Sequence, residues 1–146
     1  MKRVFSMMLT CALLFALVFT LASCSSYGKI EKNFTSAGYE IVNTTDAEGN
    51  DALSFIGDLE GEGKLSCTVH ILKKSLVSYA VILEFGANAE AQAKLDELLT
   101  DADFAALMEV DDKAQLVREN CLLIPITLNI FDAENTIGEM ITLFNK

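Results

Sequence analysis

Two apolar runs with a two-residue repeat constrain the fold of this 146-residue chain most strongly. In residues 65–71 apolar side chains at odd positions alternate with polar ones, and the same repeat continues through residues 77–85. Successive side chains of a β-strand point to opposite faces, so each run predicts a strand. Because only a short polar segment around Lys73 and Lys74 separates them, the two strands are predicted to form a hairpin.

Further helices and strands flank this predicted hairpin. Three segments have apolar residues spaced for one face of a helix: residues 30–37, residues 89–100 behind a predicted N-cap at Asn88, and the segment that follows Asp132. Three others have strand-like sequences: residues 39–44, 115–117 and 121–128. Pro125 lacks an N–H group and therefore confines the last strand to a sheet edge or a bulge. Residues 52–59 fit either a helix or a strand.

This order of elements predicts the fold class. Hairpin-linked strands with interspersed helices favour an α+β fold, a two-layer sandwich in which helices cover one face of a mainly antiparallel sheet. No internal repeat, low-complexity tract or linker interrupts the pattern. We therefore expect residues 30–146 to form a single domain.

The first 23 residues have the composition of an export signal. Lys2 and Arg3 provide a positive start, residues 4–21 are almost wholly apolar, and the small residues Ala22 and Ser23 follow. Such a segment is excluded from fold reasoning. An ordinary signal ends in a small-x-small cleavage site and requires no cysteine there, yet Cys24 comes next.

Leu21-Ala22-Ser23-Cys24 resembles the lipobox of bacterial lipoproteins at all four positions. The resemblance implies that a diacylglyceryl group is attached to the thiol of Cys24, and that residues 1–23 are removed by cleavage before it. It further implies that the domain lies in the cell envelope, anchored to a membrane and facing outside the cytoplasm. Residues 24–29, which separate Cys24 from the first predicted helix, would then form a short tether that keeps the domain close to the membrane. Ser36-Ala37-Gly38-Tyr39 also resembles a helix-to-strand junction of small bacterial lipoproteins of unknown function.

Two alternatives to the lipoprotein hypothesis stay open. The apolar run is long enough for an uncleaved membrane helix, which takes roughly 17–25 residues. Cys24 could also be incidental in an ordinary signal. Both alternatives still place the domain outside the cytoplasm.

The mature chain would be strongly acidic. Loss of Lys2 and Arg3 leaves 9 basic residues against 21 acidic ones, a formal net charge of −12. Such a charge disfavours binding to nucleic acid and to anionic lipid surfaces. It would suit a partner of positive charge.

Two cysteines remain within the predicted domain, Cys67 and Cys121, and each lies among apolar strand residues. Both are therefore expected to point into the core. Outside the cytoplasm a pair of cysteines can form a disulfide, whereas two buried thiols pack equally well as small apolar side chains. The sequence leaves both states open.

The sequence contains no recognised catalytic or metal-binding constellation. His70 is the only histidine, and Cys67, three positions away on the same predicted strand, would lie on the opposite face. We therefore expect His70 to be an exposed strand residue. One histidine and no cysteine cluster provide too few ligands for a structural zinc site, and no cofactor is expected.

Acidic residues cluster in several predicted turns. Residues 46–51 do not fit the EF-hand calcium pattern, and residues 58–63 have the composition for loose cation binding. Both segments are expected to be solvated turns. The acidic pairs of the second half are expected to cap helices or lie in loops: Asp101 with Asp103, and Asp111 with Asp112.

These observations favour a non-enzymatic, lipid-anchored domain that binds a protein or peptide near the membrane. Two alternatives remain at this point. One is a lipoprotein that captures a solute or a cation, and the other is a small hydrolase whose catalytic carboxylates come from distant loops.

The lipobox resemblance makes a direct prediction for Cys24→Ala. Because the thiol is the proposed lipid acceptor, this variant is expected to accumulate as an uncut precursor without lipid, which mass spectrometry of the membrane fraction detects. Cys11→Ala, a change inside the signal, is the matched control and should be processed normally. A parent protein that starts elsewhere than Cys24, without added lipid mass, would contradict the lipoprotein hypothesis.

Overall fold

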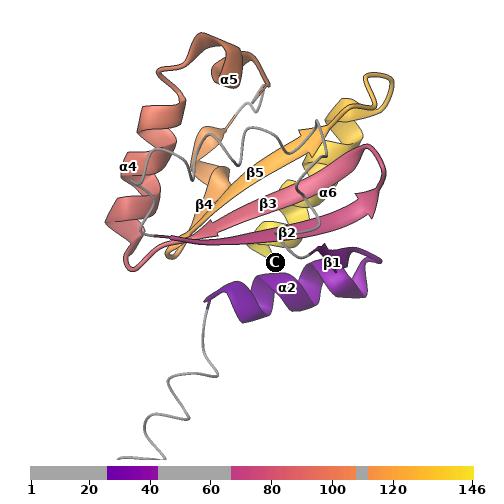
Figure 1. Cartoon of the computed structure of the whole chain (residues 1–146), viewed down its shortest axis with the longest axis horizontal. Helices are drawn as coiled ribbons and strands as arrows, with labels where there is room; N and C mark the ends of the chain where they lie inside the picture. The colour runs from indigo at the N-terminus through magenta and orange to yellow at the C-terminus, as the bar shows by residue number, and fades with distance from the viewer. Residues whose placement is uncertain (1–25, 43–66, 108–111) are drawn as a thin grey trace, which may run out of the picture.

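The computed structural model describes residues 26–42, 67–107 and 112–146 (Figure 1). The predicted signal, Cys24, the acidic segments within residues 46–63 and Asp111 lie outside these residues. Within the described part, five strands form one antiparallel sheet in the order β1-β2-β3-β5-β4. The strand bounds are Glu40–Val42 for β1, Thr68–Ser75 for β2, Ser78–Glu84 for β3, Val117–Arg118 for β4 and Cys121–Thr127 for β5. The predicted hairpin is β2–β3, and the predicted α+β fold with an antiparallel sheet is confirmed.

The central strand β3 is buried on both of its faces, from Ser78 to Leu83. In its pairing with the two neighbouring strands, Ile82 lies opposite His70 of β2, and Glu84 lies opposite Cys121 of β5. Directly opposed residues of an antiparallel pair project from the same face of a sheet. His70, Glu84 and Cys121 therefore share one face.

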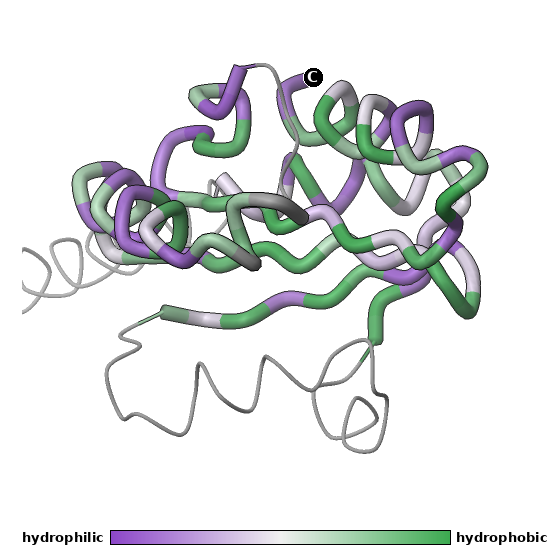
Figure 2. The backbone as a smooth tube through the Cα atoms, turned by 90° about the horizontal axis from the view of Figure 1, so that it is seen from above, coloured by the Kyte–Doolittle hydropathy of each residue, from purple (hydrophilic) through white to green (hydrophobic). Residues whose placement is uncertain are grey.

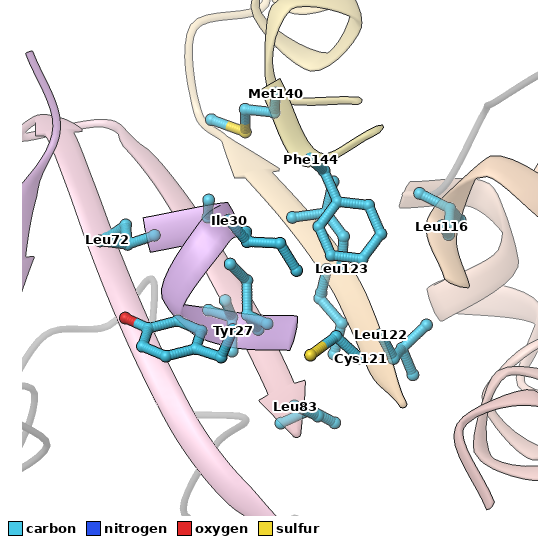
Figure 3. Close-up of a cluster of buried hydrophobic side chains, with 14 of the residues drawn as sticks. Tyr27, Ile30, Leu72, Leu83, Leu116, Cys121, Leu122, Leu123, Met140 and Phe144 are labelled. Atoms are coloured by element: carbon cyan, nitrogen blue, oxygen red, sulfur yellow. The ribbon is translucent and has the colours of Figure 1, made fainter. Parts of the chain in front are cut away.

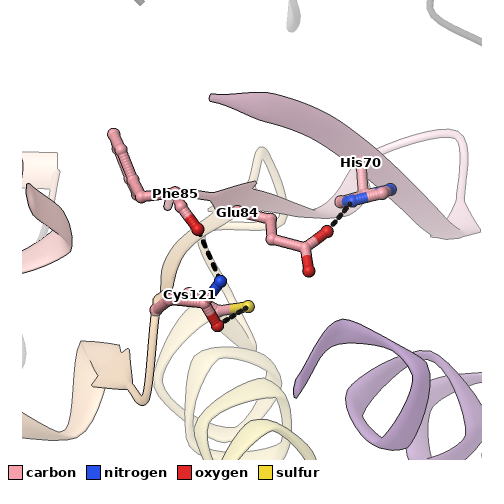
Figure 4. A network of polar contacts seen from close by, with 5 residues as sticks. His70, Glu84, Phe85 and Cys121 are labelled. Atoms are coloured by element: carbon pink, nitrogen blue, oxygen red, sulfur yellow. Dashed lines mark hydrogen bonds and ion pairs between the residues drawn. The ribbon is translucent and has the colours of Figure 1, made fainter. Parts of the chain in front are cut away.

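Helices α2 (Ser26–Ser36) and α6 (Ala133–Asn145) pack side by side on that face (Figures 3 and 4). Asn33 Nδ2 of α2 donates a hydrogen bond to the Leu143 carbonyl oxygen of α6 at 3.1 Å. Arg118 Nη1 of β4 donates to the Phe144 carbonyl oxygen at 2.7 Å. Each helix buries an apolar stripe against the sheet: Tyr27, Ile30 and Phe34 from α2, and Met140, Ile141 and Phe144 from α6. In Figure 2 the hydrophobic colour runs along the strands, whereas the helices alternate between hydrophobic and hydrophilic residues.

The remaining helices lie between β3 and β4 in the sequence. Helix α4 (Asn88–Leu98) packs against β4 and β5, α5 (Ala102–Leu107) follows it, and the 3₁₀ helix η3 (Lys113–Leu116) leads into β4. Among the described residues, no helix has both the length and the apolar character needed to cross a membrane.

Three expectations about the helix and strand bounds are corrected. Helix α2 begins at Ser26 instead of residue 30, so residues 26–29 are helical and do not belong to a tether. Residues 115–116 lie in η3, which leaves β4 with two residues. The end of α2, in contrast, lies where the sequence predicted it. Gly38 ends the helix with a φ of +90°, which a residue with a Cβ rarely adopts.

The third correction concerns the start of α4, where Ala87 and not Asn88 is the N-cap. The Glu90 carboxylate accepts hydrogen bonds from the backbone N–H of Gly86 at 3.0 Å and of Ala87 at 3.2 Å. A carboxylate three residues into a helix thus satisfies donors at its start, as in a capping box. Asn88 instead donates from its side chain to the carbonyl oxygen of Glu119.

Candidate functional site

His70 lies beneath α2 and is not an exposed strand residue, so that expectation was wrong. Its ring stacks on Tyr27 with centroids 3.4 Å apart and planes 9° from parallel. Its Nε2 lies 3.0 Å from Oε2 of Glu84, and both side chains are only 21% exposed (Figure 4). The two-residue repeat correctly separated His70 from Val69 and Ile71, but α2 covers the second face as well.

Cys121 lies next to this pair, opposite Glu84 and fully buried. Burial raises the pKa of its thiol to about 12, and the negative charges of Glu84 and Glu119 add to the rise while Arg118 opposes it. Its Sγ lies 3.9 Å from Oδ1 of Asn120, as a weak donor. A thiol with so high a pKa is protonated near neutral pH and is a poor nucleophile.

Cys67 and Cys121 are both thiols in the structure. Cys67 is half-buried and packs against the core, while Cys121 belongs to the core itself. Of the two states that the sequence left open, the structure therefore contains the thiol pair.

The tertiary structure thus brings together the side-chain types of a Cys-His-Glu site, but not in an activated form. Burial favours the protonated thiol of Cys121, and the Tyr27 ring covers one face of the imidazole of His70. Burial and the neighbouring Glu31 also hold the pKa of the Tyr27 phenol well above its ordinary value. These contacts join α2, β2, β3 and β5, and their evident effect is to hold α2 on the sheet.

Two residues of the predicted acidic pairs, Asp101 and Asp112, serve local structure. Asp101 Oδ1 accepts a hydrogen bond from the backbone N–H of Phe104 at 3.0 Å, and Asp112 Oδ1 accepts one from Ala114 at 3.1 Å. Both carboxylates cap the short helix that follows them, as expected. In the part of the chain that the structure describes, no group of three or more His, Cys, Asp or Glu side chains could hold a metal ion.

A second candidate lies at the opposite end of the sheet, where two apolar loops adjoin. The β2–β3 turn and the β5–α6 connection are joined by a hydrogen bond from the backbone N–H of Leu128 to the carbonyl oxygen of Val77, 2.8 Å long. We call their exposed side chains the apolar patch: Leu76, Val77, Leu128, Ile130 and Phe131. Phe131 is 95% exposed and Ile130 81% exposed, although aromatic and branched aliphatic side chains are normally buried.

Hydrogen bonds fix both loops of the apolar patch. Tyr79 Oη donates to the carbonyl oxygen of Leu76 at 3.2 Å, which closes the β2–β3 turn. In the second loop, Asn129 Oδ1 accepts from the backbone N–H of Phe131 at 3.3 Å, and Thr127 Oγ1 accepts from that of Asn129 at 3.2 Å. The patch is therefore presented on ordered loops, which lowers the entropic cost of binding.

Sequence reasoning missed the apolar patch. Leu76 and Val77 stand in a hairpin turn, and Ile130 and Phe131 directly precede the helix N-cap Asp132, where polar residues are usual. Those misplaced apolar residues were the available signal. The sequence does not predict that the two loops lie close together, because they are about 50 positions apart and meet only through the β3–β5 pairing.

Comparisons with known proteins give no relative: no protein-family model, no curated protein and no solved structure matches the chain.

The contacts of His70 predict that His70→Ala lowers the free energy of unfolding by about 1–2 kcal/mol, since it removes a ring stack and leaves Glu84 half-buried without its partner. Urea unfolding measures the effect. Thr68→Ala, at an exposed position of the same strand face, is the control and should cost about 0.5 kcal/mol or less. Equal losses in the two variants would show that His70 is an ordinary exposed residue.

The raised pKa of Cys121 predicts slow thiol labelling. A pKa shifted from 9.0 to about 12 lowers the thiolate fraction at neutral pH roughly a thousandfold. Alkylation of Cys121 in a Cys67→Ser variant should therefore be slow in the native protein, accelerate as the pH rises towards 12, and become fast in urea. Half-buried Cys67, in a Cys121→Ser variant, is the comparison and should react faster. Labelling of the parent protein only after reduction would instead reveal a disulfide.

Proposed function

We propose that this protein is a lipid-anchored, extracytoplasmic domain that binds a protein or peptide partner through the apolar patch. The lipobox resemblance at Cys24 supports the anchor. The observation that carries the binding function is the patch itself, five exposed apolar side chains on two adjoining, hydrogen-bonded loops. Single exposed apolar residues are common on protein surfaces, whereas five on two hydrogen-bonded loops favour an interaction site.

The residues of the apolar patch are suited to supply binding energy. Complete burial of a Leu, Ile or Phe side chain is worth about 1.5–3 kcal/mol. Phe131 has nearly its whole side chain available, and aromatic anchors commonly account for much of the energy of an interface. A few such contacts suffice for a specific complex without any catalytic group.

The alternatives draw less support from the described residues. A carboxylate-based hydrolase or a cation-capturing protein needs carboxylates that are grouped and available, but Asp101 and Asp112 are engaged in capping hydrogen bonds. His70 and Glu84 are engaged with each other and with α2. The proposal of a binding domain is therefore preferred to both.

A photo-crosslinking residue in place of Ile130 is expected to give one defined protein adduct in intact cells. The same residue in place of Ile41, an exposed apolar position on β1 outside the patch, is the control and should not give that adduct. Binding of the purified partner should weaken at least about tenfold for Phe131→Ser, because truncating an interface anchor commonly costs 2 kcal/mol or more.

Two further measurements make this experiment decisive. Phe131→Ser and Ile41→Ser should each unfold within about 0.5 kcal/mol of the parent, since both positions are exposed. If both variants bind the purified partner as tightly as the parent protein does, the apolar patch is excluded as the binding surface.

A further inference from the structure

The chain enters the fold at one defined end of the sheet. Helix α2 begins at Ser26, only two residues after Cys24, a separation that extended chain can span by at most about 7 Å. Ser26 Oγ donates a hydrogen bond to the carboxylate of Glu119 in the β4–β5 turn, and Tyr27 stacks on His70. A lipid on Cys24 would thus be attached beside the end of the sheet where β3 finishes and β5 starts (Figure 1).

The apolar patch lies at the other end of the same strands. Strand β3 begins directly after Val77, and β5 ends directly before Leu128. Seven residues of β3 at about 3.3 Å each separate the two ends by roughly 20 Å. In Figure 1 the start of α2 lies on the left of the sheet and the β2–β3 turn on the right.

Helix α2 is packed on the rest of the domain and is not a flexible tether. Its first turn is held by the contacts of Ser26 and Tyr27, and its middle is held by the hydrogen bond from Asn33 to α6. Its apolar stripe is buried against the sheet.

Resting on the proposed anchor and binding function, we infer that the apolar patch points away from the anchoring membrane and binds a protein with an apolar pocket bordered by basic residues. The separation of the two ends argues against the anchoring bilayer as the occupant. The formal charge of −12 on the mature chain also opposes contact with anionic lipid.

Charge further selects the type of protein partner. Asp132 directly follows Phe131, Glu134 lies two residues further on, and both are exposed. Lys74, on the nearby end of β2, is paired with Glu139 at 2.5 Å. A second copy of this chain would bring the same acidic residues and the same net charge to the interface, which like-charge repulsion disfavours. Lysine and arginine side chains around a pocket for Phe131 would complement them.

The orientation is tested on the full lipoprotein reconstituted in phosphatidylcholine vesicles that contain a headgroup spin-labelled lipid. In a Cys67→Ser background, a fluorophore is attached at Lys29→Cys near the anchor or at Phe131→Cys in the patch. We expect quenching at position 29 to exceed quenching at position 131 severalfold. Equal or stronger quenching at position 131 would place the patch at the bilayer and overturn the inference.

The charge of the partner is tested with the purified protein that crosslinks from position 130. Asp132→Lys combined with Glu134→Lys should weaken its binding at least about tenfold and leave the vesicle quenching unchanged; unaltered or tighter binding would overturn the basic rim. Dimerisation in light scattering that is lost in Phe131→Ser would assign the patch to a second copy and equally overturn it. The absence of any adduct would instead refute the proposed binding function, while the quenching would still report the orientation.

Discussion

The burial of β3 on both faces is the constraint on which the rest of this structure depends. Six consecutive residues, from Ser78 to Leu83, are buried, so cover is required above and below the middle of the sheet. Helices α2 and α6 provide it on one face, where they also contact each other. That cover turns the second face of β2 and β5 into core, which explains why Leu72 and Cys121 are fully buried and His70 is half-buried.

The antiparallel sheet also separates the two ends of the domain for which functions are proposed. At one end the start of α2 meets the β4–β5 turn through Ser26 and Glu119, beside the proposed lipid attachment site. At the other end the apolar patch is displayed on two loops that a hydrogen bond between Leu128 and Val77 holds together. Because β3 and β5 run between the two ends, the sheet would hold the proposed binding surface at a set distance from the proposed anchor.

The surroundings of side chains, more than their identity, decide which groups can act. His70, Glu84 and Cys121 are residue types that serve in catalysis. Desolvation, however, favours the protonated thiol of Cys121, and the imidazole of His70 is stacked on Tyr27 and hydrogen-bonded to Glu84. Phe131 and Ile130 have no special chemistry, but nearly all of their apolar surface faces solvent. The proposed function therefore rests on exposure at the apolar patch.

The sequence by itself determined the local structure: the β2–β3 hairpin, the amphipathic faces of α2 and α6, the stop at Gly38, the α+β class, and the lipobox resemblance at Cys24. These follow from periodicity, backbone preferences and a contiguous motif, all of which act over a few residues. Only the tertiary structure decided that Tyr27 covers His70, that Cys121 lies beside Glu84, and that two distant loops form one apolar patch. The alternation in a strand tells which residues share a face, but segments remote in the sequence determine whether that face is covered.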